Sequence, residues 1–446
     1  MNAIPPSASP PESARSLAAR VVTRVVDEGA FSSITLRYQL AASALEGRDR
    51  GFTTELVYGT VTWLTPIDEA LEAWMTQGLG SVPPLARAVL RVATYELLRP
   101  NRPGAAHAVV DEAVSQMHAI GLGRISGLTN AVLRKIARFG APFAAHPDAS
   151  SAATLATSGS LPLWIAERLL AARGPEGAAA AMAAWNGSSA THLRLRVPLT
   201  DALRETFTAE GIEPHRSVPG CFVMRSGSAI KVALQLGDDV AVQDAGAQWI
   251  GLVAADGLPA TARIWDVCAG LGSKAVHLAE LLPEAQVLAT DLHAHKLNAA
   301  RKAAGTLPGL RFLQADATAG PPGEEAGPYD LILLDAPCSG LGTIGRHPEV
   351  RWRRTPEDLT ATSTLQRRLL ETSAPHLAVG GRLVYAVCSW APEEGREVIR
   401  DFLARHADFA EEPLPGESEQ EQPGRLLFPD TDDTDGFFVA RLRRLC

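Results

Sequence analysis

The segment YDLILLDAPC, residues 329–338, decides the fold and points to the chemistry. Its apolar run predicts a short buried strand, and that strand ends in a carboxylate, a proline and a thiol. A second run, Arg382-Leu-Val-Tyr-Ala-Val387, ends in a second thiol, Cys388, about fifty residues later. Ligands of parallel α/β sheets bind outside the carboxyl ends of the strands. Two cysteines at two such ends therefore indicate covalent chemistry in one crevice.

Strand and helix patterns alternate along the chain from about residue 250 onward. The predicted strands lie at 263–268, 286–290, 310–314, 329–335 and 381–388, with a final pair near 425–428 and 436–442. Helices are expected to begin near Lys274, Ala294, Pro356 and Glu393. This alternation predicts a doubly wound, mostly parallel α/β sheet with helices on both faces.

The first predicted strand of this region leads into a glycine-containing turn, Ile264-Trp-Asp-Val-Cys-Ala-Gly-Leu-Gly-Ser-Lys274. Small residues let backbone N–H groups approach a ligand, and the following helix N-terminus favours negative charge. The chain lacks the Gly-x-x-x-x-Gly-Lys-Ser/Thr pattern, so a P-loop is excluded. Acids end the next three strands, at Asp291, Asp316 and Asp335. This ordered set suits S-adenosylmethionine at least as well as a dinucleotide, although any one acid could simply cap a helix.

The composition and charge of the chain limit which partners and which cellular location can be expected. The chain has 446 residues and a net charge of −8, with base concentrated at 346–354 and across the N-terminal third. Local basic patches, rather than net charge, set the affinity for phosphate, so the composition does not exclude nucleic acid as a partner. Trp352 could either stack on a base or pack in a core. The five cysteines form neither a disulfide framework nor a zinc pattern, which predicts no metal and a cytoplasmic location. They are Cys221, Cys268, Cys338, Cys388 and Cys446.

Three regions precede the α/β alternation. Residues 1–12, rich in Pro and Ser and without a signal-peptide pattern, are expected to be a disordered lead-in. Residues 13–140 carry apolar positions at helical spacing and predict a helical bundle. Residues 141–249 predict a mixed α/β adaptor, with the catalytic domain over 250–446.

Several helical segments in residues 13–140 also resemble the NusB family of RNA-binding helical domains. The resemblance rests on Arg48-to-Thr60, the helix Val89-to-Leu98, and His107-to-Ala113 through Thr129-to-Ile136, in the same order. It implies that this region binds RNA. A helical packing or dimerisation module is the alternative.

Cytosine chemistry explains why two thiols would be needed. C5 of cytosine is too weak a nucleophile to take a methyl group directly, whereas a thiolate added to C6 makes an enamine that can attack. A second group must then assist loss of the C5 proton and release of the thiol. Basic neighbours or a helix terminus are needed to populate the thiolate.

Three motifs resemble the RNA (cytosine-5)-methyltransferases of the Sun/NOL/NOP family. They are Asp335-Ala-Pro-Cys-Ser-Gly-Leu-Gly-Thr343, Arg346-His-Pro-Glu-Val-Arg-Trp-Arg-Arg354 and Tyr385-Ala-Val-Cys-Ser-Trp-Ala-Pro-Glu-Glu394. With the NusB-like region in front, the chain is similar to the bacterial 16S rRNA methyltransferases of that family. The resemblance implies a class I, Rossmann-like catalytic domain that uses S-adenosylmethionine. It also implies 16S rRNA as the partner, with neither DNA nor a membrane, and we expect a monomer.

Roles follow from the resemblance residue by residue. Cys388 would attack C6 and Cys338 would assist release, with Asp335 contacting the base or the cofactor. The cofactor would be held by Cys268, Ala269, Gly270, Leu271, Gly272, Ser273, Lys274, Asp291, Asp316 and Asp335. The family motif Ala-Ala-Pro-Gly-Gly-Lys is altered here to Ala269-Gly-Leu-Gly-Ser-Lys274, which puts cofactor affinity in question.

Other functions remain open at this point. A DNA cytosine-5 methyltransferase would use Cys338 as the nucleophile, but Cys388 would then have no role. An amino-group methyltransferase needs no thiol, and Pro337-Cys338 opposes it. A tRNA or other RNA substrate, or an RNA-binding protein that has lost the cofactor, fits the same residues.

Overall fold

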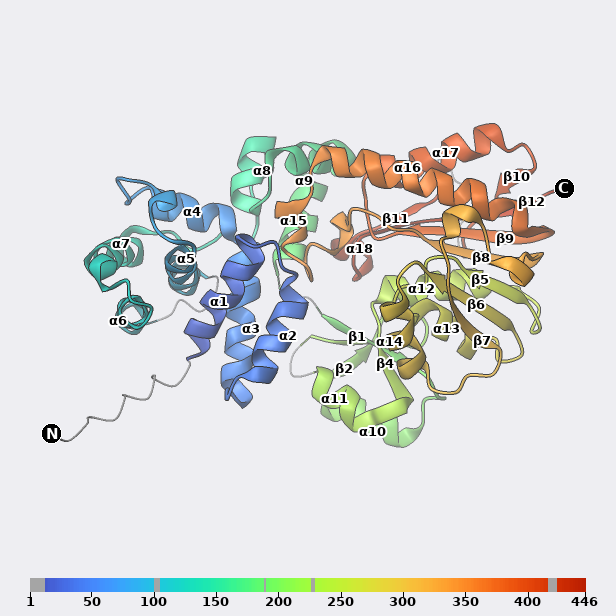
Figure 1. Cartoon of the computed structure of the whole chain (residues 1–446), viewed down its shortest axis with the longest axis horizontal. Helices are drawn as coiled ribbons and strands as arrows, with labels where there is room; N and C mark the ends of the chain where they lie inside the picture. The colour runs from blue at the N-terminus through green and yellow to red at the C-terminus, as the bar shows by residue number, and fades with distance from the viewer. Residues whose placement is uncertain (1–12, 100–104, 188–189, 226–228, 416–422) are drawn as a thin grey trace. The chain divides into compact units, whose positions relative to one another are not determined.

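The computed structural model describes residues 13–99, 105–187, 190–225, 229–415 and 423–446 (Figure 1). The predicted lead-in at 1–12 lies outside these residues. The chain divides into two compact units. Unit 1 comprises 1–187 with 344–353, and unit 2 comprises 188–343 with 354–446.

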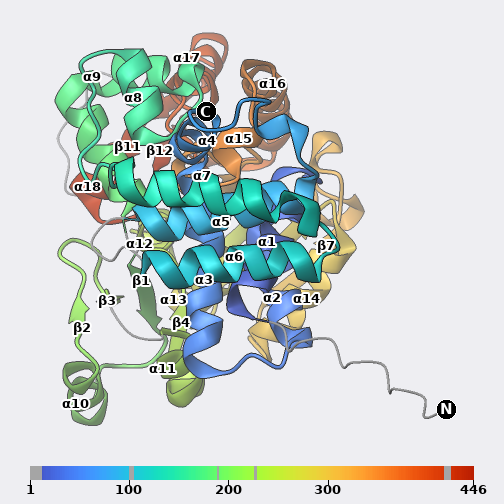
Figure 2. The ribbon, with the colours of Figure 1, turned by 90° about the vertical axis from the view of Figure 1, so that its left-hand side faces the viewer.

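Unit 1 is helical, as the apolar spacing predicts. The long helix α5 (Pro84–Leu98) lies at its centre and is buried over nearly its whole length. It begins with a proline at the first turn, where the missing N–H costs nothing. Figure 2 shows α6 and α7 running alongside α5. The other helices are α1 (Ala14–Val26), α2 (Ser32–Ala42), α3 (Gly47–Thr62), α4 (Leu64–Glu72), α6 (Ala106–Ala119), α7 (Ser126–Phe139), α8 (Ala152–Gly159) and α9 (Leu163–Asn186).

The segment 344–353, with its short helix α15 (Val350–Arg353), packs in unit 1 although it follows a strand of unit 2 in sequence. Arg351 is fully buried and donates to Ser160 O at 3.1 Å, Asn186 Oδ1 at 2.9 Å and Ile344 O at 3.1 Å. Trp352 donates from its indole to Val61 O at 2.7 Å and packs on the core of unit 1. Of the two sequence-based interpretations of Trp352, packing is therefore the correct one. Arg351 belongs to the basic stretch 346–354 noted in the sequence, but it is buried and so adds nothing to an exposed basic patch.

Unit 2 contains a small antiparallel sheet in the order β2-β3-β1-β4. Its strands are β1 (Thr191–Leu195), β2 (Ile212–Pro214), β3 (Cys221–Met224) and β4 (Val240–Val242). Helices α10 (Asp201–Ala209) and α11 (Ala229–Leu236) accompany these strands. The core of this part includes Leu193, Phe207 and Phe222.

The large sheet of unit 2 has the order β10-β12-β9-β8-β5-β6-β7, with β11 paired to β12. Its parallel strands are β5 (Arg263–Asp266), β6 (Gln286–Asp291), β7 (Leu310–Gln314), β8 (Tyr329–Asp335) and β9 (Leu377–Val387). Strand β12 (Phe437–Arg444) is antiparallel to β9, and β10 (Phe409–Glu411) and β11 (Arg425–Leu427) pair with β12. The expected doubly wound, mostly parallel sheet is thereby confirmed. Every predicted strand is present within a few residues, and β10 is an additional one.

Helices cover both faces of the large sheet because side chains alternate along each strand. On β9, Leu383, Tyr385 and Val387 face a core shared with α16 (Pro356–Ser373) and α17 (Arg396–Arg405). Val384 and Ala386 face the opposite core, shared with α12 (Ala245–Ala255) and α13 (Ser273–Leu281). A further helix, α14 (Ala294–Ala304), packs beside β6 and β7. The strand order reverses between β5 and β8, so the crevice at their carboxyl ends is the expected ligand site.

Candidate active site

The two cysteines expected to react lie next to each other. Cys338 follows β8 and Cys388 follows β9, and these parallel neighbours are in register with Asp335 opposite Ala386. Their sulfur atoms are 3.2 Å apart, both residues are half-buried, and neither forms a disulfide. The hydrogen bond to Cys388, burial and nearby negative charge raise the pKa of Cys338. Cys338 therefore keeps its proton and can donate it toward Cys388 Sγ.

A buried ion pair lies beside the thiols. Lys274, at the start of α13, places Nζ 2.6 Å from Asp335 Oδ2 at the end of β8. Burial lowers the pKa of Lys274, but the charge and hydrogen bond of Asp335 outweigh it and the net pKa is raised. Cys388 also contributes to this increase, so the ammonium lies close enough to interact with a Cys388 thiolate. A cation in that position favours the reactive form of a cysteine.

Asp266, the last residue of β5, was not singled out in the sequence. It is 1% exposed, and neither carboxylate oxygen has a partner of good hydrogen-bond geometry among the described residues, although the backbone N–H of Ala275 is near enough to lower its pKa slightly. Burial, with a smaller contribution from the charge of Asp335, raises the pKa of Asp266 to about 7. The available signal was an acid inside an otherwise hydrophobic strand, Ile264-Trp-Asp266. An unsatisfied buried carboxyl at a strand end is a feature that ligand sites tend to have.

The loop from Cys268 to Lys274 forms a tight hydrogen-bonded turn despite its altered sequence. Ala269 N donates to Thr290 O at 2.7 Å, and Gly272 N donates back to Ala269 O at 2.8 Å. Gly270 and Gly272 both have positive φ, of 57° and 78°, which other residues rarely adopt. A Cβ on Gly272 would come within 2.9 Å of Ala300 and Phe312.

The departures from the family motif fall on the outside of this turn. Leu271 is 66% exposed, and Ser273 is exposed where α13 begins. The turn is therefore built by Gly270 and Gly272 without the family proline. Cys268 precedes the two glycines, and burial raises the pKa of its thiol, which disfavours the thiolate form.

The acids after β6 and β7 differ in their surroundings. Asp291 is 8% exposed and accepts from Gly270 N at 3.0 Å and His293 N at 2.8 Å, so it holds the glycine turn after β5 in place. Asp316 is exposed and accepts from Thr318 N at 3.0 Å and Thr318 Oγ1 at 2.7 Å. These hydrogen bonds lower the pKa of Asp316. Asp316 thus caps a 3-10 turn, as the helix-cap alternative supposed, and its cofactor role stays a prediction.

The residues at this edge fit S-adenosylmethionine. The ligand carries an ammonium and ribose hydroxyls, which carboxylates bind well. Asp266, whose carboxylate lacks a well-formed hydrogen bond, and Asp291 lie at the ends of the neighbouring strands β5 and β6. Beside them runs the loop in which Gly270 and Gly272 expose the backbone. Open α/β sheets hold nucleotide-like ligands at this kind of switch point.

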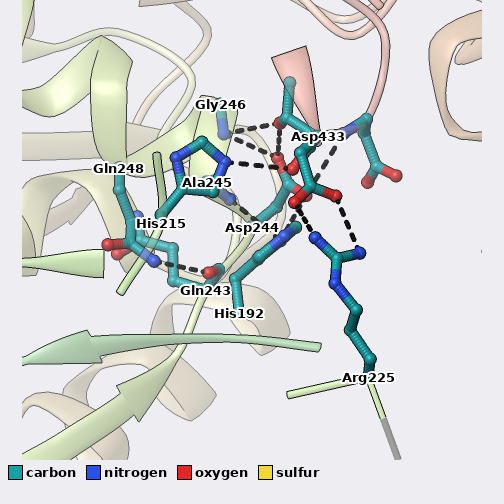
Figure 3. Close-up of polar contacts among 11 residues, drawn as sticks. His192, His215, Arg225, Gln243, Asp244, Ala245, Gly246, Gln248 and Asp433 are labelled. Atoms are coloured by element: carbon teal, nitrogen blue, oxygen red, sulfur yellow. Dashed lines mark hydrogen bonds and ion pairs between the residues drawn. The ribbon is translucent and has the colours of Figure 1, made fainter. Parts of the chain in front are cut away.

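A second polar cluster lies away from the thiols, between the small sheet and the loop before β12 (Figure 3). One ligand-type atom each of His192, His215 and Asp433 lies within 4.8 Å of the others. However, His215 Nδ1 accepts from two backbone N–H groups at 3.1–3.2 Å, and Arg225 pairs with the Asp433 carboxylate. His192 Nδ1 lies 3.2 Å from Asp244 Oδ2. These side chains are therefore engaged in hydrogen bonds and an ion pair that hold the small sheet to the loop before β12. The absence of a metal stays a prediction.

Comparison with known proteins identifies the family. The family model described as 16S rRNA methyltransferase RsmB/F matches residues 258–443, and the NusB family model matches residues 12–138. Ribosomal RNA small subunit methyltransferase B of Escherichia coli K12 is 33% identical over 442 residues, covering 96% of this chain and 98% of that protein. The chain belongs to the RsmB/F family of 16S rRNA methyltransferases. The resemblance inferred from the motifs is confirmed for both the NusB-like and the catalytic regions.

Solved structures agree with this fold. The crystal structure of PH0851 has a TM-score of 0.78 and 24% identity, covering 98% of this chain and 100% of that chain. A methyltransferase homologue from Pyrococcus horikoshii has a TM-score of 0.56 and 26% identity, covering 65% of this chain and 97% of its own. This RsmB/F-family member is an S-adenosylmethionine-dependent methyltransferase. No helix among the described residues is long and apolar enough to cross a membrane.

Proposed function

We propose that this enzyme methylates C5 of one cytosine in 16S rRNA through a covalent bond between Cys388 and C6 of the base. The observation that carries the proposal is the pair of thiols 3.2 Å apart at the ends of β8 and β9, beside the Lys274–Asp335 ion pair. A methyl transfer to oxygen or to an amino group would leave both cysteines without a role. An adduct mechanism uses both.

Each group has a task in this reaction. Cys388, beside the charge of Lys274, adds as a thiolate to C6, and the C5 enamine then takes the methyl group that S-adenosylmethionine supplies. Asp335 faces the N3/N4 edge of the base and stabilises the adduct, while Lys274 holds its Oδ2 atom. Transfer of the C5 proton to a water molecule restores the C5–C6 double bond, and cleavage of the C6–S bond releases the product and returns Cys388 as a thiolate. Cys338 assists this release by donating a hydrogen bond to the departing sulfur.

RNA is held, in this proposal, by the NusB-like region over 13–140, with residues 141–249 as adaptor and 250–446 performing the chemistry. Helix α7 presents three exposed cations, Arg134, Lys135 and Arg138. Lys135 Nζ lies 4.8 Å from the centre of the Trp74 ring, and the guanidinium of Arg138 lies 5.0 Å from that of Phe139. Cations beside exposed aromatic rings bind the phosphates and stack on the bases of unpaired RNA. Because the target base must leave any helix to reach Cys388, we expect a loop nucleotide.

The proposal places the reaction in the cytoplasm, with the enzyme acting as a monomer on RNA rather than DNA. The test is transfer of labelled methyl groups from S-adenosylmethionine to 16S rRNA, followed by nuclease digestion and identification of the product nucleoside. We expect 5-methylcytidine at a single position. Label in tRNA alone would move the substrate to another RNA. Binding of RNA without binding of S-adenosylmethionine would favour a non-catalytic protein.

A further inference from the structure

Glu394 is a fully buried carboxylate that no step of the reaction uses. It lies in the 3-10 turn Pro392–Glu394, between Cys388 and α17, and is 0% exposed. Its Oε1 atom accepts from Ser339 N at 2.7 Å and from Thr362 Oγ1 at 2.6 Å, and its Oε2 atom accepts from Ser339 Oγ. No Lys or Arg pairs with Glu394 within the part of unit 2 that the structure describes. Hydrogen bonds alone therefore compensate the burial of this charge, which is costly when any of them is missing.

These hydrogen bonds tie the two cysteine loops to each other. Ser339 directly follows Cys338, and Ser389 directly follows Cys388. The hydroxyl of Ser339, held by Glu394, lies 3.2 Å from the hydroxyl of Ser389. The carboxylate thus anchors the first loop directly and the second through one serine pair.

Further contacts fix the same two loops. Gly342 N donates to Cys388 O at 3.0 Å, and Arg354 Nε donates to Ser339 O at 2.6 Å. Gln366 Nε2 donates to Pro337 O at 2.9 Å and lies 3.4 Å from Glu394 Oε1. Glu394 is the point at which the cysteine loops and α16 meet, because it accepts from Ser339, Thr362 and Gln366 together.

The same carboxylate acts on the proton of Cys338. Its negative charge is one of the causes that raise the pKa of that thiol, after the hydrogen bond to Cys388, burial and the charge of Cys388. A neutral side chain at position 394 would remove this contribution and make Cys338 easier to deprotonate.

We propose that Glu394 is the positioning residue of the thiol pair, because its hydrogen bonds set the distance between Cys338 and Cys388. The inference rests on the proposed roles of the two thiols. It assigns Glu394 no contact with the RNA or the cofactor. Its effect on the reaction is exerted through the two sulfur atoms.

The test compares Glu394→Gln with Glu397→Gln in the full-length protein. Glu397 is an exposed carboxylate three residues further along the chain, so its substitution serves as the matched control. For Glu394→Gln we expect S-adenosylmethionine affinity within about two-fold of the parent, KM for rRNA little changed, and kcat lower by about 100-fold, as for a misplaced reacting group. Glu397→Gln should leave all three unchanged.

Alkylation of the thiols by iodoacetamide, mapped by mass spectrometry across pH, gives a readout that does not require methyl transfer. In Glu394→Gln the alkylation midpoint of Cys338 should move to lower pH, whereas Glu397→Gln should match the parent. This shift distinguishes the inference from the function, since it would appear even if the protein methylated no RNA. Parent-like kcat together with a parent-like Cys338 profile would overturn the inference.

If Glu394→Gln does not fold, Thr362→Val removes one hydrogen bond to the carboxylate while retaining its charge. We then expect a smaller fall in kcat and no change in the Cys338 alkylation midpoint. A Thr362→Val protein with parent kcat would contradict the positioning role.

Discussion

Replacing Arg351 by methionine should destabilise unit 1 without altering the way the protein holds RNA. The guanidinium is 0% exposed and makes three hydrogen bonds of 2.9–3.1 Å to Ser160 O, Asn186 Oδ1 and Ile344 O. Methionine fills similar space but leaves these three acceptors without a donor. A buried acceptor left without a donor typically costs about 1–3 kcal/mol, so the loss of three donors is expected to cost about 3 kcal/mol or more. Taking about 3 kcal/mol and roughly 2–4 °C per kcal/mol, we expect Tm to fall by roughly 6–12 °C.

The cost of burying the charge of Arg351 opposes the hydrogen bonds, so this measurement can refute the prediction. Burial lowers the pKa of Arg351 to about 9, which shows that the charge itself is costly to bury. If that cost exceeded the value of the hydrogen bonds, Arg351→Met would be neutral or stabilising. Thermal unfolding of the two full-length proteins, followed by circular dichroism, decides between these outcomes. A Tm unchanged within 2 °C, a change of roughly 1 kcal/mol at most, would refute the reasoning.

Arg138→Met is the matched control, because Arg138 is an exposed cation on α7. Its Tm should stay at the parent value, and the salt dependence of its rRNA binding should weaken by roughly one phosphate contact. Arg351→Met should show the reverse pattern, with the parent salt dependence and a lower Tm. Equal salt dependence in all three proteins would remove α7 from the RNA surface.

Four further predictions concern the cofactor edge. Asp291→Ala should weaken S-adenosylmethionine binding by roughly 1.5–3 kcal/mol in calorimetry, because hydrogen bonds to a charged group are lost; unchanged affinity would count against its role. Gly272→Ala should lower both affinity and Tm, since its Cβ would meet Ala300 and Phe312 at 2.9 Å. The double change Leu271→Pro with Ser273→Gly, on exposed positions, should retain or tighten binding. Asp266→Asn should change stability in a pH-dependent way. In the folded parent the pKa of Asp266 is raised to about 7, so folding favours the neutral carboxyl. The parent therefore loses stability as pH rises from about 4 to 7, whereas the asparagine does not titrate. The variant's Tm should therefore exceed that of the parent by more at pH 8 than at pH 5.5, and a pH-independent difference would contradict the assigned pKa.

The sequence predicts the parts of this molecule that depend on local pattern. Apolar runs followed by polar strand ends locate β5 to β9, and the positions of Cys338 and Cys388 on β8 and β9 follow from those runs. Parallel pairing of β8 with β9 then brings the two sulfur atoms together, as expected for two cysteines at the carboxyl ends of parallel strands. These features depend on periodicity and on strand order, which the alternation of helices and strands constrains.

What depends on distant partners could not be found in this way. Arg351 and Trp352 look like part of a basic, RNA-facing stretch. Their hydrogen-bond partners Ser160 and Val61, however, lie roughly two hundred and three hundred residues earlier in the chain. Glu394 resembles an ordinary helix-start acid, and only the fold shows that it is buried against Ser339. Burial and long-range pairing, rather than residue type, decide these roles.

Covalent capture of RNA tests the central claim most directly, because it reports which sulfur bonds to the base. Parent, Cys338→Ala and Cys388→Ala proteins are incubated with 16S rRNA and S-adenosylmethionine and separated on a denaturing gel. Attack by Cys388 predicts that Cys338→Ala accumulates a protein–RNA adduct, since release is stalled, and that Cys388→Ala forms none and transfers no methyl group. An adduct that persists in Cys388→Ala and disappears in Cys338→Ala would contradict the account.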